Sequence, residues 1–69
     1  MTDALREINA DLAAQYPGPY GPKYWLLPQS CVVHVRGWEM DTKGKPMGTT
    51  FFKAPTFADA LAWIEWRER

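Results

Sequence analysis

Residues 31–53 constrain the fold of this 69-residue chain more than any other segment, because they carry the pattern of a β-hairpin. From 31 to 40, apolar residues alternate with mixed ones, as they do in a strand that buries one face. Asp, Thr, Lys and Gly at 41–44 supply a turn, and a second extended run follows at 49–53. An antiparallel hairpin is therefore the first element that the sequence predicts.

Two registers are compatible with this turn, and they differ in which phenylalanine is buried. Asp41 at the first turn position and Gly44 at the fourth are typical of a type I turn followed by a left-handed glycine. This three-residue loop, which we favour, buries Phe51 and leaves Phe52 beside His34 on the opposite face. A four-residue loop would exchange the two phenylalanines. The favoured loop predicts three strand pairs: Arg36 with Thr50, Val35 with Phe51, and Trp38 with Gly48.

The same alternation assigns the two faces of the first hairpin strand. Val33 and Val35 point into the core in either register. Cys31 shares that face, and we interpret it as a small buried hydrophobe. The opposite face carries a mixed set of side chains: Val32, His34, Arg36, Trp38 and Met40.

Helical periodicity flanks the hairpin on both sides. Residues 3–15 place apolar side chains at helical spacing, and Pro17 ends this helix because the residue before a proline disfavours helical geometry. A second helix begins after Thr56, which together with Asp59 is close to a capping box. One stripe of this helix covers the sheet: Phe57, Ala60, Leu61 and Ile64.

Between the first helix and the hairpin, residues 16–24 contain three prolines, two glycines and three tyrosines. We interpret this segment as a rigid polyproline-like crossing without regular structure. Residues 25–27 form a short strand that Pro28 ends. The predicted fold class is α+β, with an N-terminal helix, a two- or three-stranded antiparallel sheet and a C-terminal helix on one face. The predicted core is Leu5, Ile8, Leu12, Trp25, Leu27, Val33, Val35, Phe51, Phe57, Leu61 and Ile64.

Composition narrows the classes of function. Eight basic residues balance eight acidic ones, which argues against a nonspecific polyanion binder and against a polybasic membrane anchor. One cysteine excludes an internal disulfide, and one cysteine with one histidine supplies too few ligands for a structural zinc site. No apolar run approaches the ~20 residues of a membrane span. We expect no cofactor, no metal and no membrane partner, and an unpaired cysteine indicates the cytoplasm.

The sequence contains no pattern that is typical of an enzyme. Cys31 and His34 stand three residues apart on a strand, so they point to opposite faces and do not form a nucleophile–base pair. The carboxylates belong to a turn, a helix cap or a helix surface. Phosphate-binding loops and the common hydrolase motifs are absent. We therefore expect that the protein is not an enzyme.

Trp66 is a large apolar residue that the predicted core does not include. At 100° per residue it lies opposite Phe57 on the second helix, with Trp63 between the two sides. We favour the interpretation that the first helix covers Trp66, in which case Leu12 and Tyr16 contact it and the chain is a monomer. The alternative is that Trp66 faces a second copy, in a weak homodimer, or another protein.

The function that we expect is noncatalytic protein–protein interaction, in a small bacterial or phage accessory protein. The alternative is single-stranded nucleic-acid binding through the hairpin face, where aromatic rings beside Arg36 could stack on bases. Neutral overall charge disfavours it. No motif is specific enough to assign a family. The candidate binding residues are His34, Arg36, Trp38, Trp63 and Trp66.

Overall fold

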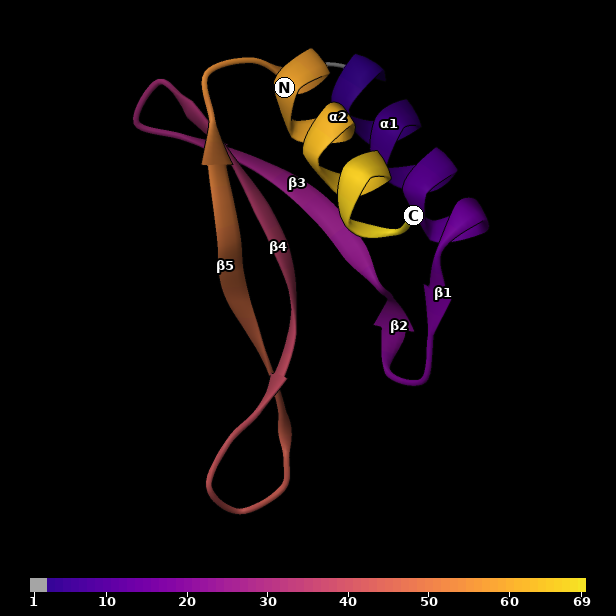
Figure 1. Cartoon of the computed structure of the whole chain (residues 1–69), viewed down its shortest axis with the longest axis vertical. Coiled ribbons are helices and arrows are strands. Elements are labelled where there is room, and N and C mark those ends of the chain that lie inside the picture. Colours follow the sequence, from indigo (N-terminus) through magenta and orange to yellow (C-terminus); the bar gives the residue numbers. More distant parts are fainter. Residues whose placement is uncertain (1–2) are drawn as a thin grey trace.

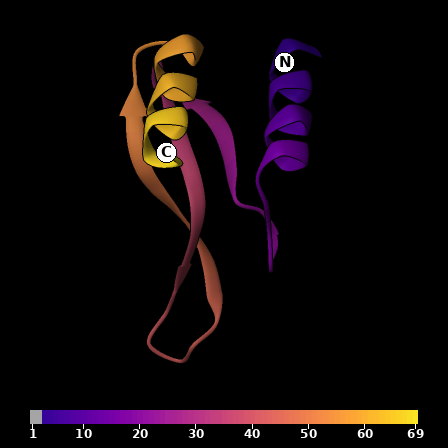
Figure 2. The ribbon, with the colours of Figure 1, turned by 45° about the vertical axis from the view of Figure 1, so that its right-hand side comes forward.

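The structure of the chain, a computed structural model, describes residues 3–69. Strands β3, β4 and β5 form an antiparallel sheet in sequence order, and β1 and β2 pair as a separate small hairpin. Both helices lie on the same side of the three-stranded sheet, α2 across it and α1 along β3 (Figures 1 and 2). This is the α+β fold that the sequence predicts. The elements are α1 (Asp3–Gln15), β1 (Pro17–Gly18), β2 (Gly21–Pro22), β3 (Tyr24–Gln29), β4 (Val32–Met40), β5 (Pro46–Ala54) and α2 (Phe57–Arg67).

Helix α1 has the predicted bounds, and the Asn9 side chain joins it to β3. Leu12 is buried, and Leu5 and Ile8 pack partly against the core. The Asn9 side chain donates to the Leu26 carbonyl oxygen (3.1 Å) and accepts from the Leu26 N–H (2.7 Å). Both backbone groups of one strand residue point to the same edge. Asn9 therefore binds Leu26 on the edge of β3 that faces away from β4.

The polyproline-like crossing predicted for 16–24 is wrong, because this segment folds back on itself as the β1–β2 hairpin. Pro17 pairs with Pro22 and Gly18 with Gly21. A Cβ atom on Gly18 would lie 2.9 Å from the Gly21 carbonyl oxygen, and Gly21 has a φ of +134°. The two glycines allow an approach and a backbone conformation that other residues resist.

The connection between β3 and β4 is a two-residue turn, Ser30 and Cys31, which both have positive φ (+53° and +65°). Two-residue hairpin turns favour such angles because they match the twist of the flanking strands. Strand β4 consequently begins at Val32, and the Cys31 side chain is exposed. The prediction that Cys31 is a buried strand residue is wrong.

We expect the Cys31 thiol to react with a thiol reagent at a similar rate in the folded and unfolded protein. The turn exposes the side chain, and thiol reactivity follows exposure as well as thiolate character. The measurement is the rate of labelling with and without denaturant. Slow labelling of the folded protein would contradict this turn.

The side chains of β3 alternate in the opposite sense from the prediction. Tyr24 and Leu26 are each only 1% exposed, whereas Leu27 is 41% exposed. Leu26 pairs with Val35 of the core face, and Leu27 with His34 of the opposite face. Trp25 and Leu27 are therefore not core residues. The segment is apolar on both sides, so only its pairing with β4 determines which side is buried.

The turn between β4 and β5 is as predicted, with Gly44 at a φ of +80° and the Gly44 N–H donating to the Asp41 carbonyl oxygen (3.1 Å). The predicted pairs Arg36 with Thr50 and Trp38 with Gly48 are confirmed. Val35, however, pairs with Phe52, because a bulge makes Phe51 an extra residue of β5. An extra residue shifts the alternation, so both phenylalanines face the helices. The prediction that Phe52 lies beside His34 is wrong.

Helix α2 begins as predicted and buries its predicted stripe. The Thr56 hydroxyl accepts from the Asp59 N–H (3.1 Å), Ala60 and Ile64 are buried, and Phe57 and Leu61 are half-buried. Trp66 is 65% exposed, so the prediction that α1 covers it is wrong. Helix α1 approaches the other flank of α2, where a hollow is lined by Ile8, Asp11, Leu12, Gln15, Tyr16, Leu61, Ile64 and Glu65.

Candidate binding surfaces

Three of the five predicted binding residues share the side of the sheet that faces away from both helices. His34, Arg36 and Trp38 alternate along β4 with the buried residues of that strand. Strand pairing adds Trp25 beside Arg36 and Leu27 beside His34. We call this side the outer face. It consists of Trp25, Leu27, Val32, His34, Arg36, Trp38, Met40, Pro46, Gly48, Thr50 and Lys53.

The centre of the outer face is a pair of tryptophans beside an arginine. The Trp25 and Trp38 rings lie 5.0 Å apart at an interplanar angle of 56°. The Arg36 Nη1 donates to the Thr50 hydroxyl (2.9 Å), and the His34 Nδ1 lies 3.2 Å from the same hydroxyl. The Arg36 Nε is buried and has no hydrogen-bond partner among residues 3–69. The arginine is thus held along the sheet, and the two rings contact each other.

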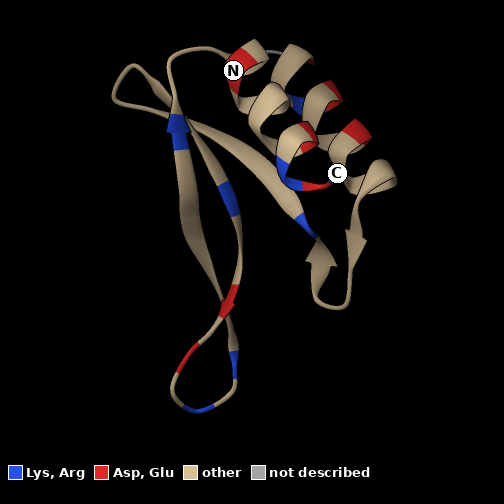
Figure 3. Cartoon of the chain, in the orientation of Figure 1, with Lys and Arg blue, Asp and Glu red and all other residues tan. Residues whose placement is uncertain are grey.

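Charge is unevenly distributed over this neutral chain. None of the outer-face residues is acidic, whereas His34, Arg36 and Lys53 are basic or titratable. Acidic side chains gather on the two helices, on the other side of the sheet (Figure 3). The net charge of zero therefore conceals a difference: the outer face carries basic side chains, and the helices carry most of the acidic ones.

Strands β4 and β5 extend beyond the helices as a projecting arm, which ends in the turn at 41–45 (Figures 1 and 2). The turn is braced by the Asp41 carboxylate, which accepts from the N–H groups of Lys43 and Lys45 (2.8 Å each). Met40 and Met47 are both 47% exposed and lie on opposite faces of the arm. The arm therefore presents apolar side chains on both sides.

The other two predicted residues, Trp63 and Trp66, lie on α2 and belong to a different surface. The Trp63 ring stacks on Phe52, with centroids 5.0 Å apart and planes 3° apart. The Arg67 guanidinium lies over both the Trp63 ring (5.2 Å) and the Phe51 ring (4.6 Å). Trp63 thus closes the side of the core, while Trp66 is exposed.

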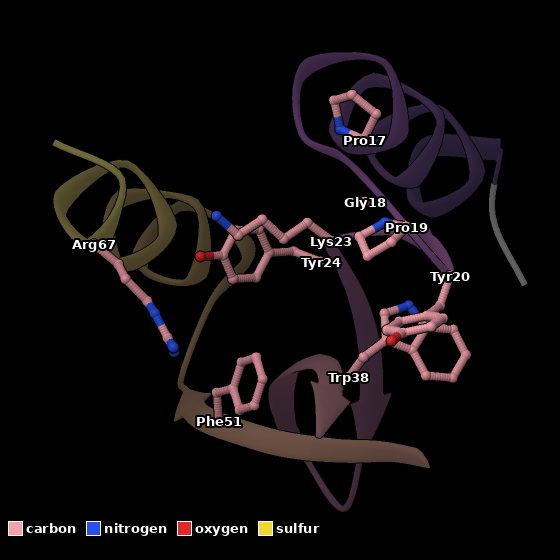
Figure 4. Close-up of a pocket in the computed structure, with 9 residues that line it drawn as sticks. All are labelled: Pro17, Gly18, Pro19, Tyr20, Lys23, Tyr24, Trp38, Phe51 and Arg67. Carbon is pink, nitrogen blue, oxygen red and sulfur yellow. The ribbon is translucent and has the colours of Figure 1, made fainter. Parts of the chain in front are cut away.

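A hollow of about 360 Å³ lies between the β1–β2 hairpin, the base of the arm and the end of α2 (Figure 4). The sequence does not reveal it, because its wall comes from four separate segments. The tyrosines at 16–24 are the only local signal. We call it the aromatic hollow, and it is lined by Pro17, Gly18, Pro19, Tyr20, Lys23, Tyr24, Trp38, Phe51 and Arg67.

Tyr24 and Glu68 connect β3 to the end of α2 beside this hollow. The Tyr24 hydroxyl donates to the Glu68 carboxylate, which also lies 2.7 Å from the Lys23 ammonium. Burial raises the pKa of Tyr24 to about 12, and the hydrogen bond to Glu68 acts in the same direction. The hydrogen bonds from Lys23 and then from Tyr24 lower the pKa of Glu68.

The Tyr24 pKa predicts a loss of stability at alkaline pH. The pKa rises from 10.0 to about 12 on folding, so the folded state favours the neutral phenol. This contribution to stability is complete below pH 10 and is lost as the pH rises towards 12. We expect the free energy of unfolding, measured with urea, to fall across this range in the wild type. In Tyr24→Phe this pH-dependent part should disappear, and a wild-type fall that persists in the variant would contradict the assignment.

Among residues 3–69, no group of three or more His, Cys, Asp or Glu side chains is placed to hold a metal ion. Within the same residues, no helix has the length and apolar character needed to cross a membrane. Comparisons with protein-family models, with curated proteins and with solved structures found no match for this chain.

Proposed function

We propose that this chain is a small noncatalytic protein-interaction module that binds its partner through the outer face. The observation that supports this most directly is a sheet face with two tryptophans at its centre, on which no helix of the described part of the chain lies. Apolar sheet faces that no other element covers are typical of surfaces that bind another molecule. The exposed Cys31 thiol supports a reducing compartment, and the location that we propose is the cytoplasm. We further propose that the chain is a bacterial or phage accessory protein.

The residue types of the outer face indicate the chemistry of the partner. Tryptophan, methionine and arginine are enriched at protein interfaces, and tryptophan and arginine dominate binding energy. Trp25, Trp38 and Arg36 are adjacent here. Because no outer-face residue is acidic, the complementary surface is apolar at its centre and acidic at its rim.

The test is affinity capture from cells of the native host with two variants that differ in the face they alter. Leu27→Glu/Met40→Glu places two carboxylates on the outer face at side chains that are already 41% and 47% exposed. Met47→Glu is the matched control, because Met47 is equally exposed on the opposite side of the arm. We expect the double variant to lose the partner and the control to retain it.

Retention of the same partner by Leu27→Glu/Met40→Glu would overturn the assignment of the outer face. Thermal unfolding of all three proteins distinguishes this outcome from misfolding. Exposed substitutions of this kind usually change stability by less than about 0.5 kcal/mol.

The exposure of Trp66 supports a second contact, a weak association between two copies of the chain. Its ring is 65% exposed on α2, away from the outer face. We propose that the chain is a monomer or a weak homodimer that uses this ring. Sedimentation equilibrium of wild type and Trp66→Ala tests it, with an expected loss of about 2 kcal/mol in association, as is usual for interface tryptophans. Identical sedimentation of both proteins would exclude Trp66 from any dimer.

A second candidate function is single-stranded nucleic-acid binding by the same face. The specific observation in its favour is the combination of the Trp25–Trp38 pair with Arg36, His34 and Lys53, without a carboxylate. Bases stack on such rings while cations contact phosphates.

A salt series with a single-stranded oligonucleotide separates the two candidates. Two or three phosphate contacts predict a slope of about −2 in log affinity against log salt, and thus a loss of roughly tenfold between 50 and 200 mM. If the outer face binds only a protein, we expect no binding of the oligonucleotide at either salt concentration. Lys53→Gln should reduce the slope, whereas Lys43→Gln, in the turn, should not.

A further inference from the structure

The aromatic hollow is a preformed recess that is independent of the outer face for most of its wall. Its volume, about 360 Å³, is at the lower end of the range of small-ligand sites. Its walls are the rings of Tyr20, Tyr24, Trp38 and Phe51 (Figure 4). The Trp38 indole N–H donates to the Pro22 carbonyl oxygen (3.0 Å), which holds the β1–β2 hairpin against the sheet. This hydrogen bond thus fixes the β1–β2 wall of the hollow to β4.

The rim of the hollow has a net positive charge. Lys23 and Arg67 both line it, and none of its lining residues is acidic. The Glu68 carboxylate is already bound by Lys23 and by the Tyr24 hydroxyl. Among residues 3–69, the structure shows no carboxylate at ion-pair distance from Arg67. The Arg67 guanidinium lies over the Phe51 ring, 4.6 Å from its centroid.

The position of Arg67 determines what kind of anion fits. A guanidinium that stacks on a ring keeps its N–H donors at its edges, where they match the two oxygens of a carboxylate. Figure 4 shows the Arg67 head group directed towards Phe51, at the side of the hollow. A ligand anion bound there would place its neighbouring atoms among the aromatic rings. Those rings favour a flat apolar group, because aromatic rings pack edge-to-face or offset on one another.

We propose that the aromatic hollow binds an aromatic carboxylate: the ring packs among Tyr20, Trp38 and Phe51, and the carboxylate pairs with Arg67. The same chemistry occurs in a free aromatic acid and in the last residue of a polypeptide that ends in an aromatic amino acid. The hollow shares Trp38 with the interaction surface proposed above, and the rest of its lining lies outside that surface.

The test is a titration with N-acetyl-L-phenylalanine, followed by the four indole N–H signals of the ¹⁵N-labelled protein. We expect the Trp38 signal to shift and the Trp66 signal, which belongs to an exposed ring outside the hollow, to remain in place. The neutral probe N-acetyl-L-phenylalanine amide should bind about tenfold more weakly, because it lacks the charged hydrogen bonds to Arg67. Equal binding of acid and amide would overturn the proposal, as would a titration in which Trp38 does not shift.

Two variants with the same change of charge test the role of Arg67. Arg67→Gln removes the guanidinium beside the hollow, and Arg69→Gln removes one that is two residues further along and does not line it. We expect about tenfold weaker binding of the acid in Arg67→Gln and no change in Arg69→Gln. Equal losses in both would show a general charge effect and overturn the site.

Two further comparisons keep the result interpretable and identify the source of the ligand. Tyr20→Ser removes an exposed ring of the wall and should weaken both probes equally; a variant that binds as tightly as wild type would remove Tyr20 from the site and overturn the proposed packing. A short peptide ending in phenylalanine then distinguishes the sources. Binding at least as tight as that of the acid supports a chain end, and binding of the acid alone supports a free aromatic acid.

Discussion

Gly37→Ala is expected to destabilise the protein by about 3 kcal/mol, the upper range for inserting a methyl group into a packed core. A Cβ atom at Gly37 would lie 2.2 Å from the Cε2 atom and 2.8 Å from the Cζ atom of Phe51, and 3.0 Å from the Lys23 carbonyl oxygen. Tyr24 and Arg67 pack against the Phe51 ring, so it can yield only towards the aromatic hollow, at the cost of these contacts. Urea unfolding of wild type and variant measures the loss.

Gly44→Ala is the control for Gly37→Ala, because it isolates backbone strain from crowding. Gly44 has a φ of +80°, and apart from Gly44 itself and its two chain neighbours, no atom of residues 3–69 lies within 4 Å of the point that an added methyl group would occupy. Its loss should therefore be about 1 kcal/mol, from strain alone. In Gly37→Ala/Phe51→Leu the smaller side chain should recover part of the loss. Equal losses at the two glycines would contradict the close packing of Phe51 against β4.

Leu26→Ala is expected to cost about 3 kcal/mol in the free energy of unfolding, whereas Leu27→Ala should cost less than about 1 kcal/mol. The two leucines are neighbours in sequence but differ in exposure, 1% against 41%. Leu26 packs in the core opposite Val35, and truncating it leaves a cavity that the surrounding side chains fill only in part. Urea unfolding of both variants is the measurement, and the reverse order of losses would show that β3 presents its other side to the core.

The helices and the turn before β5 were predictable because their signals are local. Pro17 ends α1, Thr56 caps α2, and Asp41 with Gly44 forms the turn between the hairpin strands. Each of these depends on a few neighbouring residues and their backbone preferences. Their bounds in the structure follow the predicted ones closely.

The errors concern features that depend on contacts between distant segments. The apolar run that contains Leu26 has no alternation of its own, so its pairing with β4 decides which residues are buried. The bulge at Phe51 lets the Phe52 ring stack on Trp63. The residues of the turn do not predict this contact. Trp66 is exposed because α1 docks on β3 and approaches only the other flank of α2, across a hollow.

The candidate surfaces also divide into a part that local sequence patterns predict and a part that depends on contacts between distant segments. His34, Arg36 and Trp38 were placed together correctly, because alternation along one strand is a local pattern. The aromatic hollow was missed, since Tyr20, Phe51 and Arg67 meet only in the folded chain. The segregation of charge between sheet and helices was also hidden in a net charge of zero.

The two hydrogen bonds of Asn9 restrict how copies of this protein could join edge to edge. A side-chain amide has the same donor and acceptor as a peptide group, so Asn9 occupies the site on Leu26 where an incoming strand would bind. Two residues further along the same edge, Pro28 has no N–H to donate. Among the strands of residues 3–69, the edge that stays open to pairing is therefore that of β5. Two copies that paired through β5 would use this edge of both, and residues 3–69 would offer no second open edge from which a continuous fibre could grow.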